Sequence, residues 1–338
     1  MLSQKAKVLQ ALGGRTMLNH VLTTANKISN KISVVVGFDK EGVEEEIKKI
    51  GINANTYLQK EQIGTADAVK TTLKDIDKNE KILILYGDVP LIKKETLEKL
   101  CNQESDLSIL TTNLKNPTGY GRALKDKENN VLGIIEEKDA DLEQKKIKEI
   151  FTGILVAKGS VLKNFIPEID NNNSAKEFYL TDLIGIAHKN GFKINTLSSS
   201  NEETAGANNR IEQEELEKTL RIMKSEDLLK NGATLLDKSR VDVRGEVKMG
   251  SDCVIDVNVI FEGHVELGNN VEIGANTIIC DTKIGDKTYN AGEFASISVV
   301  QDLTEIFHPL EGSAQADKTG LLLHGVDLNE LFEPVESG

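Results

Sequence analysis

Hydrophobic and polar residues follow two rhythms along the chain, and the first covers residues 15 to about 230. Short apolar runs there alternate with segments whose apolar residues recur every three or four positions, which predicts strands alternating with amphipathic helices. The predicted strands are 32–38, 81–86, 107–111, 131–135, 149–157 and 193–197. The predicted helices are 17–28, 40–50, 66–75, 94–101 and 180–190. This alternation predicts an α/β domain with a mostly parallel sheet.

A long charged helix is expected over about 211–229, and beyond it the pattern repeats every six residues. One series with this spacing consists of Val241, Val247, Cys253, Val259, Val265, Val271 and Thr277. A second series, from Val243 to Ile279, keeps the same spacing two residues later. Repeats of this length are typical of a β-helix, in which each repeat is one short strand with an aliphatic side chain turned inward. Since stacked β-hairpins do not easily give seven repeats in phase, we expect a β-helix that ends when the period is lost after Lys287.

The net charge and composition exclude several classes of protein. The 338 residues carry a formal net charge of −13 and no block of Lys and Arg that offsets it, which argues against a nucleic-acid-binding surface. The three cysteines are widely spaced, as expected for thiols in a reducing compartment. We find no signal-peptide pattern and no apolar run near the roughly 20 residues that span a bilayer, so we expect a cytoplasmic protein without membrane insertion.

The last part of the chain, 289–338, differs from the rest. It contains nine acidic residues and one lysine, and its apolar patches have no period. This composition predicts either a disordered acidic extension or a segment foreign to the rest of the chain.

The most informative single segment is the apolar run 82–85 with the residues that follow it, Tyr86, Gly87 and Asp88. A continuous apolar run bounded by turn residues predicts a strand buried on both faces. Open α/β folds bind ligands at the carboxyl edge of the sheet, so Asp88 is well placed to hold a metal beside a phosphate. The alternative is that Asp88 caps the helix starting near Lys93, or makes a turn.

Four further segments contain residues that suit a ligand site. A Gly-Thr turn precedes the helix at residue 66, and a Gly-rich loop occupies 116–122. Carboxylates end the strand before residue 140, and residues 206–210 open the long charged helix. The start of a helix offers free backbone N–H groups to a base edge or a phosphate. Each segment alone is as readily a turn or a helix cap.

Taken in order, these segments resemble one family, the bacterial bifunctional N-acetylglucosamine-1-phosphate uridyltransferase / glucosamine-1-phosphate acetyltransferase. The matching segments are QKEQIGTADAV, LYGDVPLI, NPTGYGR, GIIEEKDA, TGILVA, EFYLTDLI and GANNR. The resemblance runs from about residue 1 to 288. It implies a Rossmann-like nucleotidyltransferase domain over 1–222, a helical arm over 223–238, a short left-handed parallel β-helix over 239–288 and a non-repeat tail.

The resemblance also implies an activity and partners. In this family the first domain transfers UMP from UTP to N-acetylglucosamine 1-phosphate in a Mg²⁺-dependent reaction. The products are pyrophosphate and UDP-N-acetylglucosamine, a precursor of peptidoglycan and lipopolysaccharide. The β-helix forms trimers in the family, so the resemblance implies a homotrimer.

Site residues are carried over motif by motif. Asp88 and Asn208 would hold Mg²⁺, and Lys7 matches the family lysine that contacts phosphate. The residues that would contact the nucleotide are Gln59, Gly64, Thr65, Tyr86 and Gly87. The residues that would face the sugar are Gly121 and Glu136. These residue types suit an in-line attack on phosphorus, which needs positioning and positive charge rather than a covalent nucleophile.

This sequence departs from the family pattern in several places. In the family a strand and a loop of the form Gly-x-Gly-Thr-Arg-Met precede the phosphate-binding lysine, and Met1 aligns with the last residue of that loop. The first, central strand is therefore expected to be missing. Ala6 replaces a Pro, and Phe151 replaces an Asn that contacts the sugar, where an aromatic side chain would fill the pocket.

These departures lead us to expect little or no UDP-N-acetylglucosamine synthesis by the chain as given. The family's acetyltransferase residues lie beyond the point where this repeat stops, so acetyl transfer is not expected. Two alternatives stay open at this point. One is a catalytically inactive remnant or scaffold subunit of the same family. The other is a related nucleotidyltransferase that uses another sugar phosphate.

Overall fold

The computed structural model describes residues 5–290 and divides the chain into two compact units. The first unit comprises Met1–Ala11 and Thr16–Gln213, and the second comprises Leu12–Arg15 and Glu214–Gly338. The predicted end of the first domain at residue 222 therefore falls inside a helix, nine residues beyond the division between the units. The predicted acidic tail lies, apart from its first two residues, outside the described residues.

Helices of the first unit largely match the predicted ones. They are α1 (Met17–Asn26), α2 (Lys40–Ile50), α3 (Thr65–Lys70), α4 (Lys94–Cys101), α5 (Gly159–Phe165), α6 (Asp182–Lys189) and α7 (Asn201–Thr204). Short 3-10 turns add η1 (Lys7–Leu9), η2 (Leu73–Asp75), η3 (Gln144–Lys146) and η4 (Ile166–Glu168). The predicted helix 66–75 is thus divided into α3 and η2, and α5 and α7 were not predicted.

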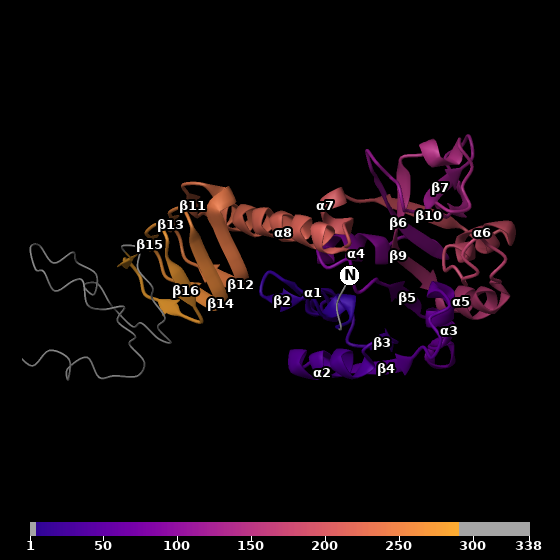
Figure 1. Ribbon diagram of the computed structural model, residues 1–338, viewed down its shortest axis with the longest axis horizontal. Helices are drawn as coiled ribbons and strands as arrows, with labels where there is room; N and C mark the ends of the chain where they lie inside the picture. The colour runs from indigo at the N-terminus through magenta and orange to yellow at the C-terminus, as the bar shows by residue number, and fades with distance from the viewer. Residues whose placement is uncertain (1–4, 291–338) are drawn as a thin grey trace, which may run out of the picture. The chain divides into compact units, whose positions relative to one another are not determined.

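Strands of this unit are more numerous than the sequence pattern indicated. They are β3 (Ile32–Val36), β4 (Ala54–Leu58), β5 (Lys81–Ile84), β6 (Leu107–Asn113), β7 (Arg122–Lys125), β8 (Val131–Ile135), β9 (Glu149–Lys158) and β10 (Ile194–Ser198). Six of these strands form one sheet in the order β10-β6-β9-β7-β8, with β5 paired to β9 as well (Figure 1). β4 and β7 were not predicted.

The six-stranded sheet is mixed, so the prediction of a mostly parallel sheet is wrong for it. β9 runs antiparallel to β5, β6 and β7, whereas β10 runs parallel to β6. β9 is ten residues long, and all but its two end residues are buried. A strand buried on both faces is a continuous apolar run whichever way it points, so the run did not reveal its direction. β5 and β6 are parallel to each other, with β9 between them.

β3 and β4 form a separate parallel pair in the described part of the chain. Lys31, just before β3, pairs with Glu80, just before β5, at 2.9 Å. The amino ends of β3 and β5 therefore lie close together. Within residues 5–290, β3 has no strand partner except β4, and β5 has none except β9. Two strand edges are thus left without a partner, as Figure 1 shows by the separation of β3 and β4 from the larger sheet.

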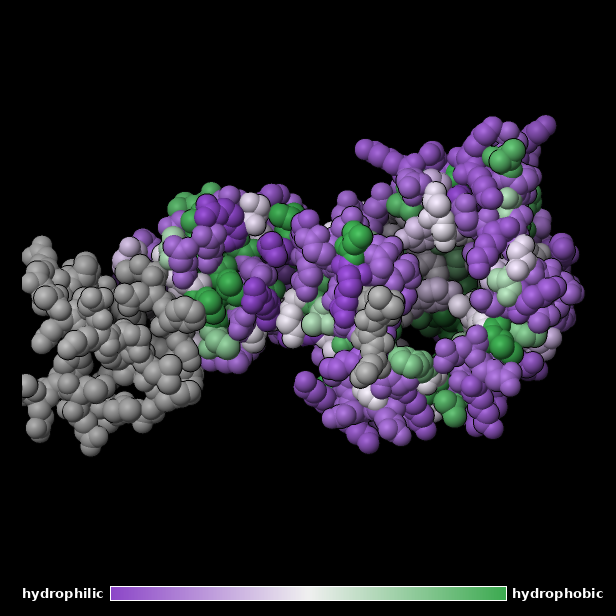
Figure 2. Space-filling view, viewed as in Figure 1, coloured by the Kyte–Doolittle hydropathy of each residue, from purple (hydrophilic) through white to green (hydrophobic). Residues whose placement is uncertain are grey.

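The free edge explains a difference in burial. The apolar run of β5 was predicted to be buried on both faces, but Ile82, Leu83 and Ile84 are only partly buried. In contrast, β6 is buried from Leu107 to Thr112 because it has a neighbour on each side. In the view of Figure 2 the surface of the first unit is hollowed, and apolar residues lie in the depth of the hollow. An unpaired edge leaves both backbone groups and apolar side chains accessible to water.

The second unit contains one long helix and a series of parallel strands. The helix is α8 (Arg210–Lys230), and a 3-10 turn, η5, covers Lys238–Arg240. The strands are β11 (Thr234–Leu235), β12 (Val241–Met249), β13 (Val254–Ile255), β14 (Val259–Leu267), β15 (Glu272–Ile273), β16 (Ile278–Cys280), β17 (Lys283–Ile284) and β18 (Tyr289–Asn290). The order β11-β13-β15-β18 makes one sheet, and β12-β14-β16 with β17 makes another.

Strand pairing in this unit advances by a fixed number of residues, as in stacked coils. Val241 pairs with Val259 and Ile260 pairs with Ile278, each 18 residues on, or three repeats of six. From β17 onward the offset is 17, as in Glu272 with Tyr289. The stacking continues one position out of phase to residue 290, three residues beyond the predicted loss of period after Lys287, and the rest of the predicted non-repeat tail lies outside the described residues. The buried positions of this out-of-phase stretch are Thr282, Ile284, Thr288 and Asn290.

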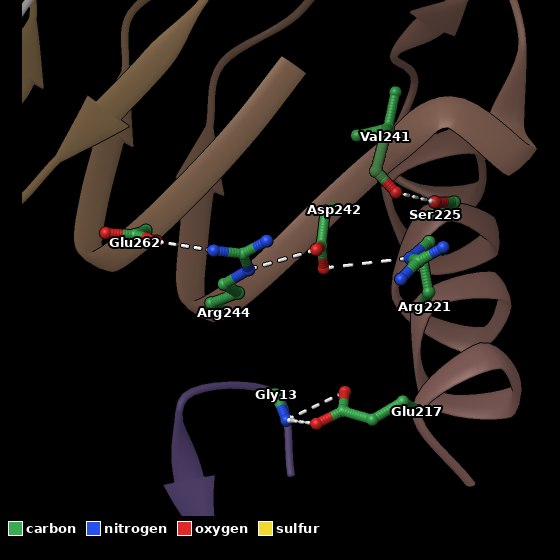
Figure 3. A network of polar contacts seen from close by, with 8 residues as sticks. All are labelled: Gly13, Glu217, Arg221, Ser225, Val241, Asp242, Arg244 and Glu262. Atoms are coloured by element: carbon green, nitrogen blue, oxygen red, sulfur yellow. Dashed lines mark hydrogen bonds and ion pairs between the residues drawn. The ribbon is translucent and has the colours of Figure 1, made fainter. Parts of the chain in front are cut away.

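The inner four residues of a tight hairpin near the start of the chain, Leu12–Arg15, belong to the second unit. The strands of the hairpin are β1 (Ala11–Leu12) and β2 (Arg15–Thr16), joined by Gly13 and Gly14. Both glycines have positive φ, 53° and 79°, as a two-residue turn of type I′ requires. The Gly13 N–H donates to the Glu217 carboxylate at 3.0 and 3.1 Å. Figure 3 shows this contact beside a chain of ion pairs among Arg221, Asp242, Arg244 and Glu262.

Within residues 5–290 no helix is both long and apolar enough to cross a membrane.

Candidate active site

Three predicted site residues meet beyond the end of β5. The Lys7 ammonium pairs with the Asp88 carboxylate and donates to the Asn208 amide oxygen at 2.9 Å. These residues are separated by up to 201 positions in the sequence. Side chains of Lys7 and Asp88 remain 32% and 20% exposed, so the cluster is open to a ligand. The alternative in which Asp88 caps α4 is not what the structure shows, since the N-cap of that helix is Lys93.

Backbone packing explains why these segments come together. Val8, in the turn η1, lies so close to Gly87 that a Cβ on Gly87 would sit 3.0 Å from the valine side chain. A Cβ on Gly206 would lie 3.1 Å from the backbone oxygen of Asp88. The Ala6 N–H donates to the Asp39 carboxylate at 2.9 Å, which ties the start of the described chain to the end of β3. The small residues therefore allow the three segments to approach closely.

The chemistry of the cluster fits a hard divalent cation. Asp88 offers a carboxylate oxygen and Asn208 an amide oxygen, and both oxygens face the same ammonium group. Oxygen ligands of this kind suit Mg²⁺, which usually binds one or two protein groups and completes its shell with water and substrate phosphates. No group of three or more His, Cys, Asp or Glu side chains suited to a metal occurs within the described residues, so a denser protein cage is not found there.

The predicted nucleotide-side residues lie in two adjacent groups. Tyr86 hydrogen-bonds to Thr65, whose hydroxyl also accepts the Leu180 N–H at 2.9 Å. Burial, with smaller effects from the charges of Glu136 and Asp88, raises the pKa of Tyr86 to about 12, against the Thr65 hydrogen bond that lowers it. The Tyr86 hydroxyl is therefore under the influence of both Asp88 and Glu136, on the predicted sugar side.

Gln59 and Gly64 form the second group. The Gln59 amide donates to the Gly64 carbonyl at 2.9 Å and to the Asp67 carboxylate at 3.0 Å. Gly64 has φ of 136°, and a Cβ there would lie 2.3 Å from the Phe178 carbonyl oxygen. Only glycine fits this position. The Gly-Thr turn is thus held against the segment before α6, and α3 begins at Thr65 rather than at residue 66.

The predicted sugar-side residues are also neighbours. A Cβ on Gly121 would lie 3.5 Å from both carboxylate oxygens of Glu136. Glu136 accepts a hydrogen bond from the Thr181 hydroxyl at 2.9 Å. Burial raises the pKa of Glu136, and the Thr181 hydrogen bond partly opposes that rise. A partly buried carboxylate with one fixed partner retains free lone pairs, which suits the binding of a hydroxyl or amide group.

Phe151 lies next to this group through its backbone. Its N–H donates to the Gly121 carbonyl at 2.9 Å, and its side chain is 5% exposed within the main apolar core of the unit. The ring therefore packs in a core that includes Ala123 and Ile134. The expectation that it fills a sugar pocket stays a prediction.

Sequence reasoning missed several polar residues near the predicted site residues. Arg122 is 1% exposed, donates to the Tyr120 carbonyl and pairs with Glu137. Burial, with smaller effects from Glu136 and other carboxylates, raises the pKa of Asp182 to about 6. Glu212 hydrogen-bonds to the segment that carries Asn208. Arg122 and Asp182 lie in motifs quoted above, so the motifs could have pointed to them. Glu212 lies outside those motifs, and nothing in the sequence marked it as a site residue.

Comparison with known proteins supports the relationship that the motifs indicated. Residues 2–140 match the family described as MobA-like NTP transferase domain. The chain is 44% identical over 288 residues to the bifunctional protein GlmU of Neisseria meningitidis serogroup B (strain ATCC BAA-335 / MC58), a match that covers 84% of this chain. It is 43% identical over 292 residues, or 85% of its length, to the bifunctional protein GlmU of Marinomonas sp. (strain MWYL1). The chain spans less than two thirds of these relatives, 62% and 64% of their lengths.

A solved structure shows the same fold in a more distant protein. It contains a protein assigned as a glucose-1-phosphate thymidylyltransferase from Bacillus anthracis, in complex with sucrose. The similarity has a TM-score of 0.51 at 18% identity and covers 63% of this chain and 85% of the other. At that identity the similarity concerns the Rossmann-like nucleotidyltransferase fold alone. The predicted resemblance is confirmed by the sequence matches: the chain is similar to bifunctional GlmU proteins over 84–85% of its length, and its N-terminal part matches an NTP transferase domain.

Proposed function

We propose that the first unit transfers UMP from UTP to N-acetylglucosamine 1-phosphate in a Mg²⁺-dependent reaction. The observation that carries this proposal is the convergence of Lys7, Asp88 and Asn208 beyond β5, beside the Tyr86–Thr65 contact. A cation, a carboxylate and an amide oxygen in one exposed cluster suit the binding of a polyphosphate. The similarity to bifunctional GlmU proteins favours N-acetylglucosamine 1-phosphate over another sugar phosphate as the acceptor of UMP.

The chemistry assigned to the site is an in-line substitution at the α-phosphorus of UTP. A phosphate oxygen of the sugar phosphate forms the new bond to that phosphorus, and the bond to the bridging oxygen of pyrophosphate breaks. Asp88 and Asn208 would hold Mg²⁺, which supplies positive charge at the phosphates when bound. The Lys7 ammonium adds a second positive charge in the same space, where negative charge increases during the reaction.

The remaining residues are assigned to substrate positioning. Gln59, Gly64 and Thr65 would contact the uracil, with Tyr86 and Gly87 along the nucleotide. Gly121 and Glu136 would face the sugar, and the bond from Thr181 keeps the Glu136 carboxylate oriented. Fixing both substrates in this way supplies much of the rate enhancement in reactions without a covalent intermediate.

The direct test uses the purified chain with UTP, N-acetylglucosamine 1-phosphate and Mg²⁺, and measures UDP-N-acetylglucosamine by mass spectrometry. Since the expected rate is low, the chain is used in excess over UTP. Absence of product under that condition, or product only with dTTP and glucose 1-phosphate, would contradict the proposal. Rapid multiple turnover at catalytic concentrations would instead contradict the expectation of low activity.

We expect Phe151→Asn to lower the KM for the sugar phosphate and to lower stability at the same time. The backbone of residue 151 lies beside Gly121, so a new amide there is close to the predicted sugar side, while the loss of a buried ring costs about 3 kcal/mol of unfolding free energy. KM measurements and urea unfolding check both effects. Phe151→Leu is the matched control, because it removes the ring without adding an amide. An equal KM in the two variants would argue against a sugar contact at this position.

We further propose that the stacked coils of the second unit are the first turns of a left-handed parallel β-helix, preceded by a helical arm. The pairing of parallel strands every 18 residues supports this assignment. We expect homotrimers, because one such prism buries its aliphatic side chains inward and leaves its flat faces available to other copies. Sedimentation equilibrium measures the mass, and a value equal to one chain at micromolar concentration would contradict trimer formation.

A further inference from the structure

The start of α8 is closed by two reciprocal sets of hydrogen bonds. The side-chain oxygen of Asn209 accepts the N–H groups of Ile211 and Glu212, each at 2.9 Å. In return, the Glu212 carboxylate accepts a hydrogen bond from the Asn209 side-chain amide at 2.6 Å. This arrangement is a variant of the capping box, in which Glu212, the third helical residue, accepts the side-chain amide of Asn209 instead of its backbone N–H, and it fixes the direction in which the chain enters the helix.

Glu212 extends this box to the residue that faces Lys7. Its second carboxylate oxygen accepts the backbone N–H of Asn208 at 2.6 Å. One carboxylate therefore holds two consecutive residues of the entering loop, Asn208 by its backbone and Asn209 by its side chain. Asn208 itself is exposed, so neighbouring side chains do not enclose it.

The position of Asn208 matters because its amide oxygen is one of the two oxygens that converge on Lys7. The other oxygen, from Asp88, lies on the segment after β5, which is packed against Gly206. A change in the path of 206–209 would thus separate the two oxygens. The backbone N–H of Asn208 donates to Glu212, and this bond restrains the peptide plane from which the Asn208 side chain projects.

Tyr120 gives an independent indication that Glu212 faces the cluster. Burial raises the pKa of the Tyr120 hydroxyl, and the charges of Glu212 and Asp88 raise it further. Both carboxylates are therefore near the same ring, although they lie on different segments. Glu212 is itself only partly exposed.

From this geometry we propose that Glu212 is a positioning residue for the metal site, which acts by orienting Asn208 and does not itself bind metal or substrate. The proposal rests on the function assigned above. Both carboxylate oxygens of Glu212 are engaged by donors of the loop, so they serve the loop rather than a cation. Groups that orient a metal ligand in this way typically affect metal affinity by about 10- to 100-fold.

Direct binding tests the proposal without any need for turnover. Mn²⁺ is titrated into the full chain in the presence of UTP, and free Mn²⁺ is followed by its electron paramagnetic resonance signal. We expect Glu212→Ala to weaken Mn²⁺ binding by about tenfold or more. Glu212→Gln keeps one acceptor oxygen for the loop but turns an NH2 group towards the second donor, so it should weaken Mn²⁺ binding less than Glu212→Ala does.

Two further variants distinguish the orientation of Asn208 from the charge of Glu212 and from a general loss of stability. Thr16→Ala removes the cap of α1, where the Thr16 hydroxyl accepts the Asn19 N–H at 3.0 Å, and should leave Mn²⁺ binding unchanged. Asn209→Ala opens the capping box while the Glu212 carboxylate remains, and should weaken Mn²⁺ binding like Glu212→Ala. Asn209→Ala also provides the test if Glu212→Ala does not fold.

The outcomes are distinguishable. Unchanged Mn²⁺ binding in both folded Glu212→Ala and Asn209→Ala would overturn the positioning role alone. Equal weakening in Glu212→Gln and Glu212→Ala would show that the acceptor oxygen kept by Gln does not position Asn208, and would also overturn it. Absence of UTP-dependent Mn²⁺ binding in the parent chain would contradict the proposed function, and the positioning role would fall with it.

Discussion

Asp88→Asn is expected to reduce UDP-N-acetylglucosamine formation by about 100-fold or more, the usual cost of losing one electrostatic contact to a reacting phosphate or oxyanion. The substitution keeps the shape of the side chain but removes its negative charge, so one of the two converging oxygens becomes a much weaker ligand for a divalent cation. It also releases the Lys7 ammonium from its partner. Product formation under excess enzyme is the primary measurement, and UTP-dependent Mn²⁺ binding should weaken in parallel.

A matched control for this variant exists at the opposite end of the sheet. Asp106 precedes β6 and pairs with Lys158 at 2.7 Å, with a carboxylate that is 28% exposed compared with 20% for Asp88. Because β5 and β6 are parallel, Asp106 lies at an amino end and Asp88 beyond a carboxyl end. Asp106→Asn should leave product formation unchanged. Equal losses in the two variants would show that the effect of Asp88→Asn is a general loss of an ion pair.

An added strand before Met1 is expected to stabilise the first unit by about 3 kcal/mol. Five apolar residues followed by a flexible linker of about ten residues would reach the space between β3 and β5. Burial of five apolar side chains contributes roughly 7–15 kcal/mol, and ordering the same residues costs roughly 1.5 kcal/mol each. Ala6 contacts Asp39 just after β3, and Lys7 contacts Asp88 just after β5. The start of the described chain is therefore already near the ends of both strands, so a short linker is sufficient.

Two measurements check the added strand. Urea unfolding gives the free energy change, and hydrogen exchange reports whether amides of β3 and β5 become protected. An extension of equal length with Pro at alternate positions is the control, because it cannot donate the hydrogen bonds of a central strand. Protection elsewhere in the unit, with β3 and β5 unchanged, would contradict the expected position of the strand.

Local patterns predicted the elements that are set by local physics. The helix 40–50 and the strand 131–135 were predicted to the residue, because each has a clear period and clear ends. The coils of the second unit followed from their six-residue spacing. The shift at residue 281 was not visible because Thr282 and Thr288 take buried positions that earlier repeats fill mostly with aliphatic side chains. A threonine there reads as a surface residue until the packing is known.

Tertiary features were beyond such patterns. β4 has exposed and partly buried positions only, so its sequence lacks the apolar alternation of a half-buried strand. The direction of β9 depends on its partners and not on its composition. Glu212 lies on a charged helix, where a glutamate is ordinarily a solvated residue, and only the loop geometry reveals its two contacts. The order of the motifs was enough to predict the site residues, whereas the contacts between them could be seen only in the folded structure.

The hairpin at Gly13 has a consequence for dividing the gene. Because Leu12–Arg15 packs with the second unit, the boundary between the units is crossed three times by the chain and not once. A reading frame opened at codon 214 would encode the long helix from Glu214 onward and the coils, but would lack the four residues Leu12–Arg15. Glu217 would then lose the backbone donor that Gly13 provides, and Leu220 would lose the glycine turn that covers it. A fragment that begins at residue 214 is therefore not the complete second unit.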